Sequence, residues 1–192
     1  NYWYVAANAT EIGQKPLGRR ICGQPIVLYR KSNGALAALE DKCTHRLVAL
    51  SLGTVVGDEI ECGYHGVRFD CAGQCTHIPS QPELAIPRGM NIRNYPVHEA
   101  FGLVFVWIGD AERADTRLIP GWYDYNTRDG WRTVYGYTHV RGHYQLLVDN
   151  LLDLTHVNYT HRTTLASPGL AEVVPDVRVD DETVEITRTM YN

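Results

Sequence analysis

The stretch that decides the fold contains two short motifs, Cys-Thr-His at positions 43–45 and Cys-Gly-Tyr-His at positions 62–65. Each motif places one thiol and one imidazole on a single loop, and sixteen residues separate the two motifs. Proteins use thiolates and imidazoles to bind zinc and iron–sulfur clusters. We therefore expect Cys43, His45, Cys62 and His65 to form a metal site.

Two metal groups fit these four ligands. Two Cys and two His, with His second in each pair, favour a Rieske [2Fe–2S] centre, in which both Cys bind one iron and both His bind the other. Neutral imidazoles leave such a cluster with less negative charge, so it accepts an electron more readily. Gly63 and Gly66 would let the second loop turn tightly around the inorganic sulfurs. The alternative is a zinc clip with the same ligands, which would be colourless.

Composition limits the classes of function. The chain of 192 residues is 44% hydrophobic and has a net charge of −4, which argues against a nucleic-acid or anionic-membrane surface. No apolar run approaches the roughly 20 residues of a membrane span, and we expect no signal peptide. Five cysteines are an odd number, and two have metal-ligand spacing, so we expect no disulfide framework and a cytoplasmic location.

The pattern of the chain changes near residue 112. Residues 1–112 predict an all-β domain, because short apolar runs alternate with Gly, Asn and Asp. The charged residues 110–117 predict a linker or a short helix, and residues 113–192 predict a second domain. The clearest strands of the first domain are residues 25–29, 36–40 and 103–107, with a hairpin over 69–75 that turns at Gly73.

The second domain predicts a mixture of strands and a helix. Residues 133–140 alternate like a strand, and residues 144–158 lack Gly and Pro and present a broad apolar surface, as a helix does. Residues 177–187 predict a hairpin that turns at Asp180–Asp181. The chain ends within what resembles a sheet, so we expect a C-terminal part to be missing.

A second set of ligands lies in the predicted helix, as Asn150, Asp153, His156 and His161. Asp153 and His156 are three apart and would share a face. His156 and His161 lie about 140° apart on a regular helix, so they can bind one metal only if the helix ends or distorts between them. Two His and a carboxylate are the ligands of non-haem Fe(II) oxygenases. The alternative is a buried Asp–His pair with a capping His, but the upstream Cys/His motifs favour iron.

Taken together, the motifs resemble those of the terminal oxygenase (alpha) subunits of Rieske non-haem iron oxygenases. The branch that contains vanillate O-demethylase, dicamba O-demethylase and toluenesulfonate methyl-monooxygenase is the most similar. This resemblance implies an α+β fold, with an all-β Rieske [2Fe–2S] domain followed by the start of a mixed α/β catalytic domain, an antiparallel sheet with helices. The segments that carry it are residues 1–7, 15–19, 40–46, 50–53, 62–66 and 148–156.

The resemblance also implies roles for individual residues. His156 and His161 would bind a mononuclear non-haem Fe(II), and Asn150 would lie near it. Asp153 would accept hydrogen bonds from His156 and from a Rieske histidine of a neighbouring subunit, in a homotrimer whose electron path crosses between chains. The chain departs from the family at Thr44, where a proline is usual and where we expect a slightly looser loop. The family's third iron ligand, an Asp, would lie beyond residue 192.

The implied activity is that of an oxygenase which uses O₂ to hydroxylate a small aromatic substrate at a methyl or O-methyl carbon. Electrons would come from a separate NAD(P)H-dependent flavin/iron–sulfur reductase, with or without a ferredoxin, because the chain has no Gly-rich dinucleotide motif. Three alternatives remain open. They are an aromatic ring-hydroxylating dioxygenase, a Rieske-type electron carrier without oxygenase chemistry, and a zinc-stabilised binding module.

Overall fold

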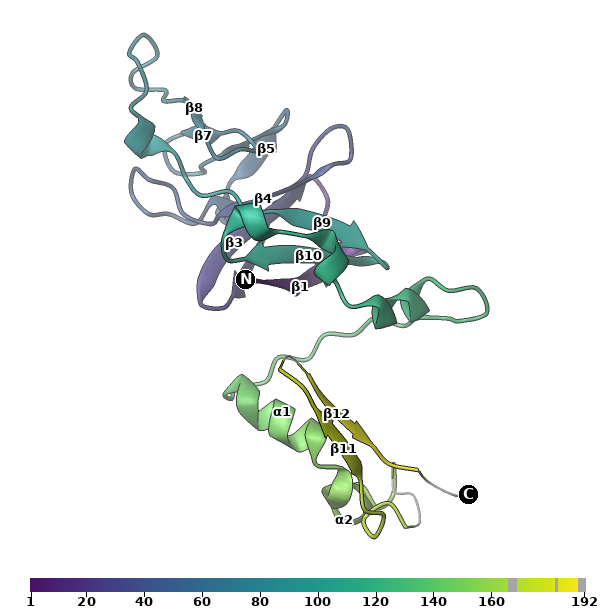
Figure 1. Cartoon of the computed structure of the whole chain (residues 1–192). Coiled ribbons are helices and arrows are strands. Elements are labelled where there is room, and N and C mark those ends of the chain that lie inside the picture. Colours follow the sequence, from purple (N-terminus) through teal and green to yellow (C-terminus); the bar gives the residue numbers. More distant parts are fainter. Residues whose placement is uncertain (166–168, 182, 190–192) are drawn as a thin grey trace. The chain divides into compact units, whose positions relative to one another are not determined.

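The structure, a computed structural model, describes residues 1–165, 169–181 and 183–189, which form two units with a division after Tyr135 (Figure 1). The first unit is all-β apart from short 3₁₀ helices, and the second combines helices with a hairpin. This confirms the expected α+β class. The domain boundary expected after residue 112 stays a prediction. Among the described residues, no helix is long and apolar enough to cross a membrane.

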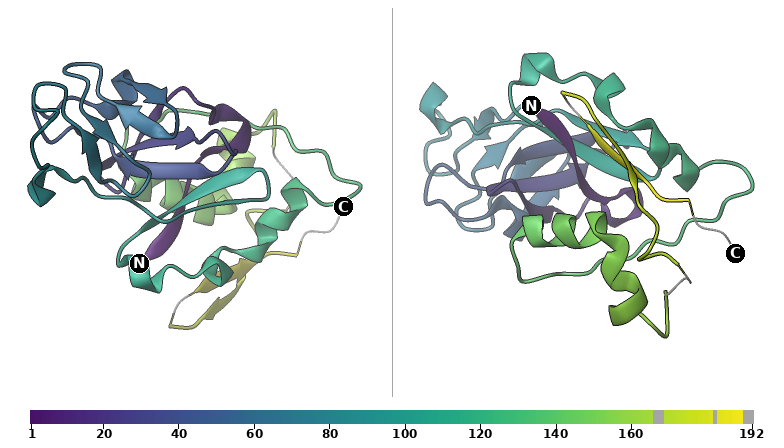
Figure 2. Two further views of the ribbon diagram at one scale, coloured as in Figure 1. Left: turned by 90° about the horizontal axis from the view of Figure 1, so that it is seen from above. Right: turned by 60° about the horizontal axis from the view of Figure 1, so that its bottom comes forward.

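Three antiparallel sheets build the first unit (Figures 1 and 2). The first has the order β1 (Tyr2–Asn8), β10 (Leu103–Ile108), β9 (Val97–Ala100). The second consists of β2 (Leu17–Ile21), β3 (Gln24–Arg30) and β4 (Leu36–Glu40). The third consists of β5 (Thr54–Val56), β6 (Glu59–Glu61), β7 (Arg68–Phe69) and β8 (Cys75–His77). These strands confirm the sequence predictions for the first domain, including the hairpin with Gly73 at positive φ.

The β2–β3–β4 sheet is buried on both faces, because successive side chains of a strand point to opposite sides. Ile26 and Leu28 pack with strands β1 and β10, whereas Val27 and Tyr29 pack with the β5–β8 sheet. All four side chains are fully buried. Each such burial contributes about 1.5–3 kcal/mol. The middle sheet therefore fixes the β5–β8 sheet, and with it the loops that carry the first set of ligands.

Short 3₁₀ helices connect the strands and extend the first unit beyond β10. Those after β10 confirm the linker with short helices expected near residue 110, and Ile119 there packs on Phe105. The six 3₁₀ segments of this unit are Ala9–Glu11, Leu50–Leu52, Arg88–Met90, Ala111–Arg113, Thr116–Leu118 and Gly121–Asn126.

The second unit contains α1 (Tyr144–Leu152), a 3₁₀ turn at Leu154–His156 and α2 (Val157–Thr160). The hairpin of β11 (Asp176–Val179) and β12 (Val184–Thr187) follows. It confirms the hairpin predicted over residues 177–187, because Val179 pairs with Val184 on either side of the expected turn at Asp180–Asp181.

Two expectations for the second part of the chain were wrong. Residues 133–140 form no strand, because alternation makes a strand only where a partner strand supplies hydrogen bonds, and no described strand pairs with them. The single helix over 144–158 is broken at Asp153, whose backbone is extended (φ −96°, ψ 91°). The Asp153 side chain accepts a hydrogen bond from the Thr155 N–H, and this cap begins the next turn.

Candidate metal centres

The two thiols of the first set are buried side by side. Cys43 follows β4, Cys62 follows β6, and only 1% and 3% of their surfaces are exposed. Burial raises the pKa of the Cys43 thiol, and the adjacent Cys62 thiol raises it further, while the backbone N–H groups of His45 and Arg46 oppose the rise. N–H groups that lower the pKa of a thiol favour its thiolate form, so these two would stabilise a metal-bound thiolate at Cys43.

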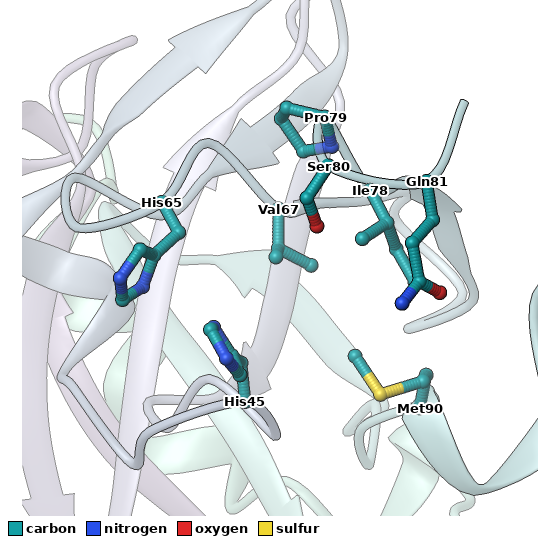
Figure 3. Close-up of a pocket in the computed structure, with 8 residues that line it drawn as sticks. All are labelled: His45, His65, Val67, Ile78, Pro79, Ser80, Gln81 and Met90. Carbon is teal, nitrogen blue, oxygen red and sulfur yellow. The ribbon is translucent and has the colours of Figure 1, made fainter.

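The two imidazoles lie at the surface and face each other. The ring centroids of His45 and His65 are 4.5 Å apart, with 60° between the ring planes. Both rings lie at one end of an open pocket whose other walls are largely apolar (Figure 3). The volume of this pocket is about 420 Å³. Met90 lies on the His45 side of this pocket. The site therefore has a buried thiol side and an exposed imidazole side.

The two ligand loops have the same backbone hydrogen bonds. The N–H of Cys43 donates to the Val48 carbonyl, and the N–H of Cys62 donates to the Val67 carbonyl, both at 2.8 Å. Four residues after each Cys, an N–H donates back to the carbonyl of that Cys. The donors are Leu47 and Gly66, and both have positive φ (61° and 69°). Gly66 adopts this conformation without strain. Leu47 carries a Cβ, so the same conformation strains it by about 1–2 kcal/mol. The sequence indicated a tight turn at Gly66, but it gave no indication of the positive φ at Leu47.

The loops can approach each other because both carry a glycine at the contact. A Cβ at Gly53 would lie 2.0 Å from the Glu61 carbonyl oxygen, and one at Gly63 would lie 3.1 Å from the Leu52 carbonyl oxygen. The role of Gly53 was missed at the sequence level. Its only signal was its place in segment 50–53, one of the segments that carry the family resemblance.

A second missed feature closes the base of the first loop. Asp41 accepts hydrogen bonds from the backbone N–H and the hydroxyl of Ser51, at 2.7 and 2.6 Å. Because Asp41 precedes the loop and Ser51 follows it, this pair holds the two ends together. An Asp and a Ser ten residues apart carry no signal in a single sequence.

The second set of ligands flanks the short helix α2. His156 precedes it and His161 follows it, and the centroids of their rings are 5.4 Å apart. The helix thus ends between them, as the sequence argument required. His156 Nδ1 lies 2.6 Å from the Asp153 carbonyl oxygen. This contact orients the ring and leaves Nε2 available for a metal.

The Asp153 carboxylate is exposed and engages Thr155. It accepts hydrogen bonds from the Thr155 N–H at 3.0 Å and from its hydroxyl at 2.6 Å. These bonds lower the pKa of Asp153, and the charges of His156 and Arg188 lower it further. The sequence argument placed Asp153 and His156 on one helical face, but the helix break instead presents the backbone carbonyl of Asp153 to His156. Asn150 lies exposed on α1, one turn before the break.

The chain matches known proteins over almost its whole length. Residues 2–96 match the Rieske [2Fe-2S] domain, and residues 140–192 match the vanillate O-demethylase oxygenase C-terminal domain. The oxygenase component of dicamba O-demethylase from Stenotrophomonas maltophilia is 43% identical over 187 residues, 96% of this chain and 54% of that protein. A vanillate O-demethylase oxygenase subunit from a Pseudomonas species is 41% identical, over 100% of this chain and 53% of that protein.

A crystal structure of dicamba monooxygenase with non-haem iron and dicamba matches with a TM-score of 0.81 and 40% identity, over 98% of this chain and 53% of that one. The chain belongs to the Rieske non-haem iron oxygenases. It spans about half the length of the curated relatives that it matches.

The donor set suits the cofactors of a Rieske oxygenase. No three His, Cys, Asp or Glu side chains gather into one metal-binding group within residues 1–165, 169–181 and 183–189. A [2Fe–2S] cluster needs two protein ligands at each of two irons, so a thiol pair and an imidazole pair fit it. A zinc clip would need all four ligands around one ion. At the other site, the described residues supply a histidine pair without a third ligand.

Proposed function

We propose that this protein is the terminal oxygenase component of a multicomponent Rieske monooxygenase. It hydroxylates a small aromatic substrate at a methyl or O-methyl carbon, and uses O₂ and electrons from a separate NAD(P)H-dependent reductase, with or without a ferredoxin. The observation that carries this proposal is the pairing of two ligand sets in one chain, one with buried thiols and exposed imidazoles and one with two histidines around α2. The dicamba and vanillate O-demethylases support the substrate class.

The ligands divide between two metal groups. Cys43 and Cys62 would hold one iron of the [2Fe–2S] cluster, and His45 and His65 would hold the other. His156 and His161 would hold a mononuclear Fe(II). When bound, the cluster supplies single-electron transfer and the mononuclear iron supplies oxygen activation.

The exposure of the ligand side chains suggests a path for electrons into and out of the cluster. Because the thiols are buried and the imidazoles are exposed, His45 and His65 form the face through which a partner exchanges electrons. Asp153 is also exposed, so its carboxylate is accessible to an imidazole of another subunit. This arrangement supports a homotrimer in which Asp153 links the mononuclear site of one chain to the cluster of the next. We place the protein in the cytoplasm, where free thiols persist.

The full-length protein allows a direct test. Reconstituted anaerobically, it should bind about three irons per chain, two in an EPR-active cluster and one at the histidine pair. Methoxybenzoates and methyl-aryl acids should then be screened for O₂ uptake coupled to release of formaldehyde or alcohol. A reducible cluster without a third iron and without substrate-dependent O₂ uptake would instead identify an electron carrier.

Replacing Asp153 with asparagine should lower turnover by about 10–100-fold while both metal groups are retained, since asparagine keeps the size but not the charge that holds an imidazole N–H. Single-turnover oxidation of the reduced cluster in the presence of substrate measures this step. Asp149→Asn, an exposed change on α1, is the matched control and should behave as the wild type. Unchanged cluster oxidation in Asp153→Asn would contradict the bridging role.

A further inference from the structure

Thr44 lies between two ligands of the first loop, and its hydroxyl reaches outside that loop. The Thr44 hydroxyl donates a hydrogen bond to the backbone carbonyl of Met90 at 2.9 Å. The partners are 46 residues apart in the chain. This bond fastens the loop that carries Cys43 and His45 to the 3₁₀ segment Arg88–Met90, and it offsets the loosening expected from a residue other than proline at this position.

The acceptor of this bond is itself held in place. The Met90 side chain packs against the hydrophobic cluster that contains Cys43 and Cys62. The next two residues are fixed to the β7–β8 hairpin: the Asn91 side-chain oxygen accepts from the Cys75 N–H at 3.0 Å, and the Ile92 N–H donates to the Gly73 carbonyl at 2.8 Å. Thr44 is therefore bonded to a segment that is held in place independently of the ligand loop and would not move with it.

The bond anchors Thr44, the residue immediately before the peptide units of His45 and Arg46. The backbone N–H groups of His45 and Arg46 interact with the Cys43 thiol and act to lower its pKa. Hydrogen bonds to a cluster's sulfur ligands stabilise its more negative, reduced form, and so raise its reduction potential. If the Thr44 hydroxyl is removed, the peptide units at 45 and 46 gain freedom and these N–H···S bonds weaken.

We propose that Thr44 is a positioning residue that sets the reduction potential and the lifetime of the cluster through its hydrogen bond to the Met90 carbonyl. This inference rests on the cluster assignment of the proposed function. It concerns a bond made by the Thr44 hydroxyl, and it does not require Thr44 to touch either iron.

The test compares two Thr44 variants of the full-length holoprotein with the wild type by EPR-monitored redox titration and by the rate of cluster loss in a chelator. Thr44→Val keeps the shape and removes the hydroxyl. It should lower the midpoint potential and speed cluster loss by about five-fold, the factor that one typical hydrogen bond supplies. Thr44→Ser restores the donor and should return both values towards those of the wild type.

Thr76→Val is the matched control for the loss of a threonine hydroxyl, because Thr76 is exposed on β8, where valine is well tolerated. An unchanged potential in Thr44→Val, or an equal shift in Thr44→Ser, would overturn the inference and leave the proposed function intact. A wild-type protein without a Rieske EPR signal would instead overturn the proposed function. Faster cluster loss in Thr44→Val without a change in potential would reduce Thr44 to a purely structural residue and would also contradict the inference.

Discussion

Replacing Gly53 with alanine should leave the protein unable to assemble its [2Fe–2S] cluster. The added Cβ would lie 2.0 Å from the Glu61 carbonyl oxygen and 3.1 Å from the Gly63 nitrogen, and both of these are backbone atoms that no rotamer change can move. The two ligand loops would have to separate, which misplaces Cys62 relative to Cys43. Overpacking of this kind costs about 1–3 kcal/mol or more. The visible absorbance of the cluster and its EPR signal should be absent after reconstitution.

Gly13→Ala is the matched control, because a Cβ at Gly13 meets no atom within 4 Å and its backbone does not have positive φ. That variant should bind the cluster as the wild type does. Far-ultraviolet circular dichroism of Gly53→Ala separates loss of the cluster from loss of the fold. A Gly53→Ala protein with a full complement of cluster would show that the loops need not approach so closely.

Replacing His161 with alanine should remove the mononuclear iron and abolish turnover, while the Rieske cluster stays intact. His161 supplies one of only two ligands that the described residues offer at this site. Loss of a residue that merely orients a metal ligand already costs 10–100-fold in affinity, so loss of the ligand itself should cost more. Iron analysis should show about one iron fewer per chain, with an unchanged cluster EPR signal.

His139→Ala serves as the control. His139 is an exposed histidine within residues 133–140, and its ring Nδ1 lies 3.4 Å from the Tyr137 hydroxyl. It should keep its iron and its activity. If His161→Ala retained the third iron, the assignment of the histidine pair would be lost, and the break at Asp153 would need another explanation.

The sequence predicted the first unit well because its signals are local. A strand such as residues 103–108 is indicated by its consecutive apolar residues. The residue types and spacing of the Cys/His motifs indicate metal binding. The contacts that shape the site were less accessible. Gly53, the Asp41–Ser51 pair and the Thr44–Met90 bond each depend on residues that meet only after the sheets have packed.

The second unit was harder for a different physical reason. Residues 133–140 alternate as a strand does, but alternation says nothing about whether a partner strand exists. The sequence predicts one continuous helix over residues 144–158, including Asp153, because no Gly or Pro interrupts this stretch. The signal for its break was Asp153 two residues before Thr155, a capping pattern that competes with helix continuation.

The pairing of β1 with β10 has a consequence for how the chain folds. Tyr2 lies opposite Ile108, so β1 can pair only after about 100 further residues have been synthesised. All four strands of the β5–β8 sheet lie within residues 54–77. Contacts between distant parts of a chain form slowly. During synthesis, the hairpin that carries Cys62 and His65 can therefore fold before β1 pairs with β10. A chain truncated before β10 would leave that strand with an open edge and invite aggregation.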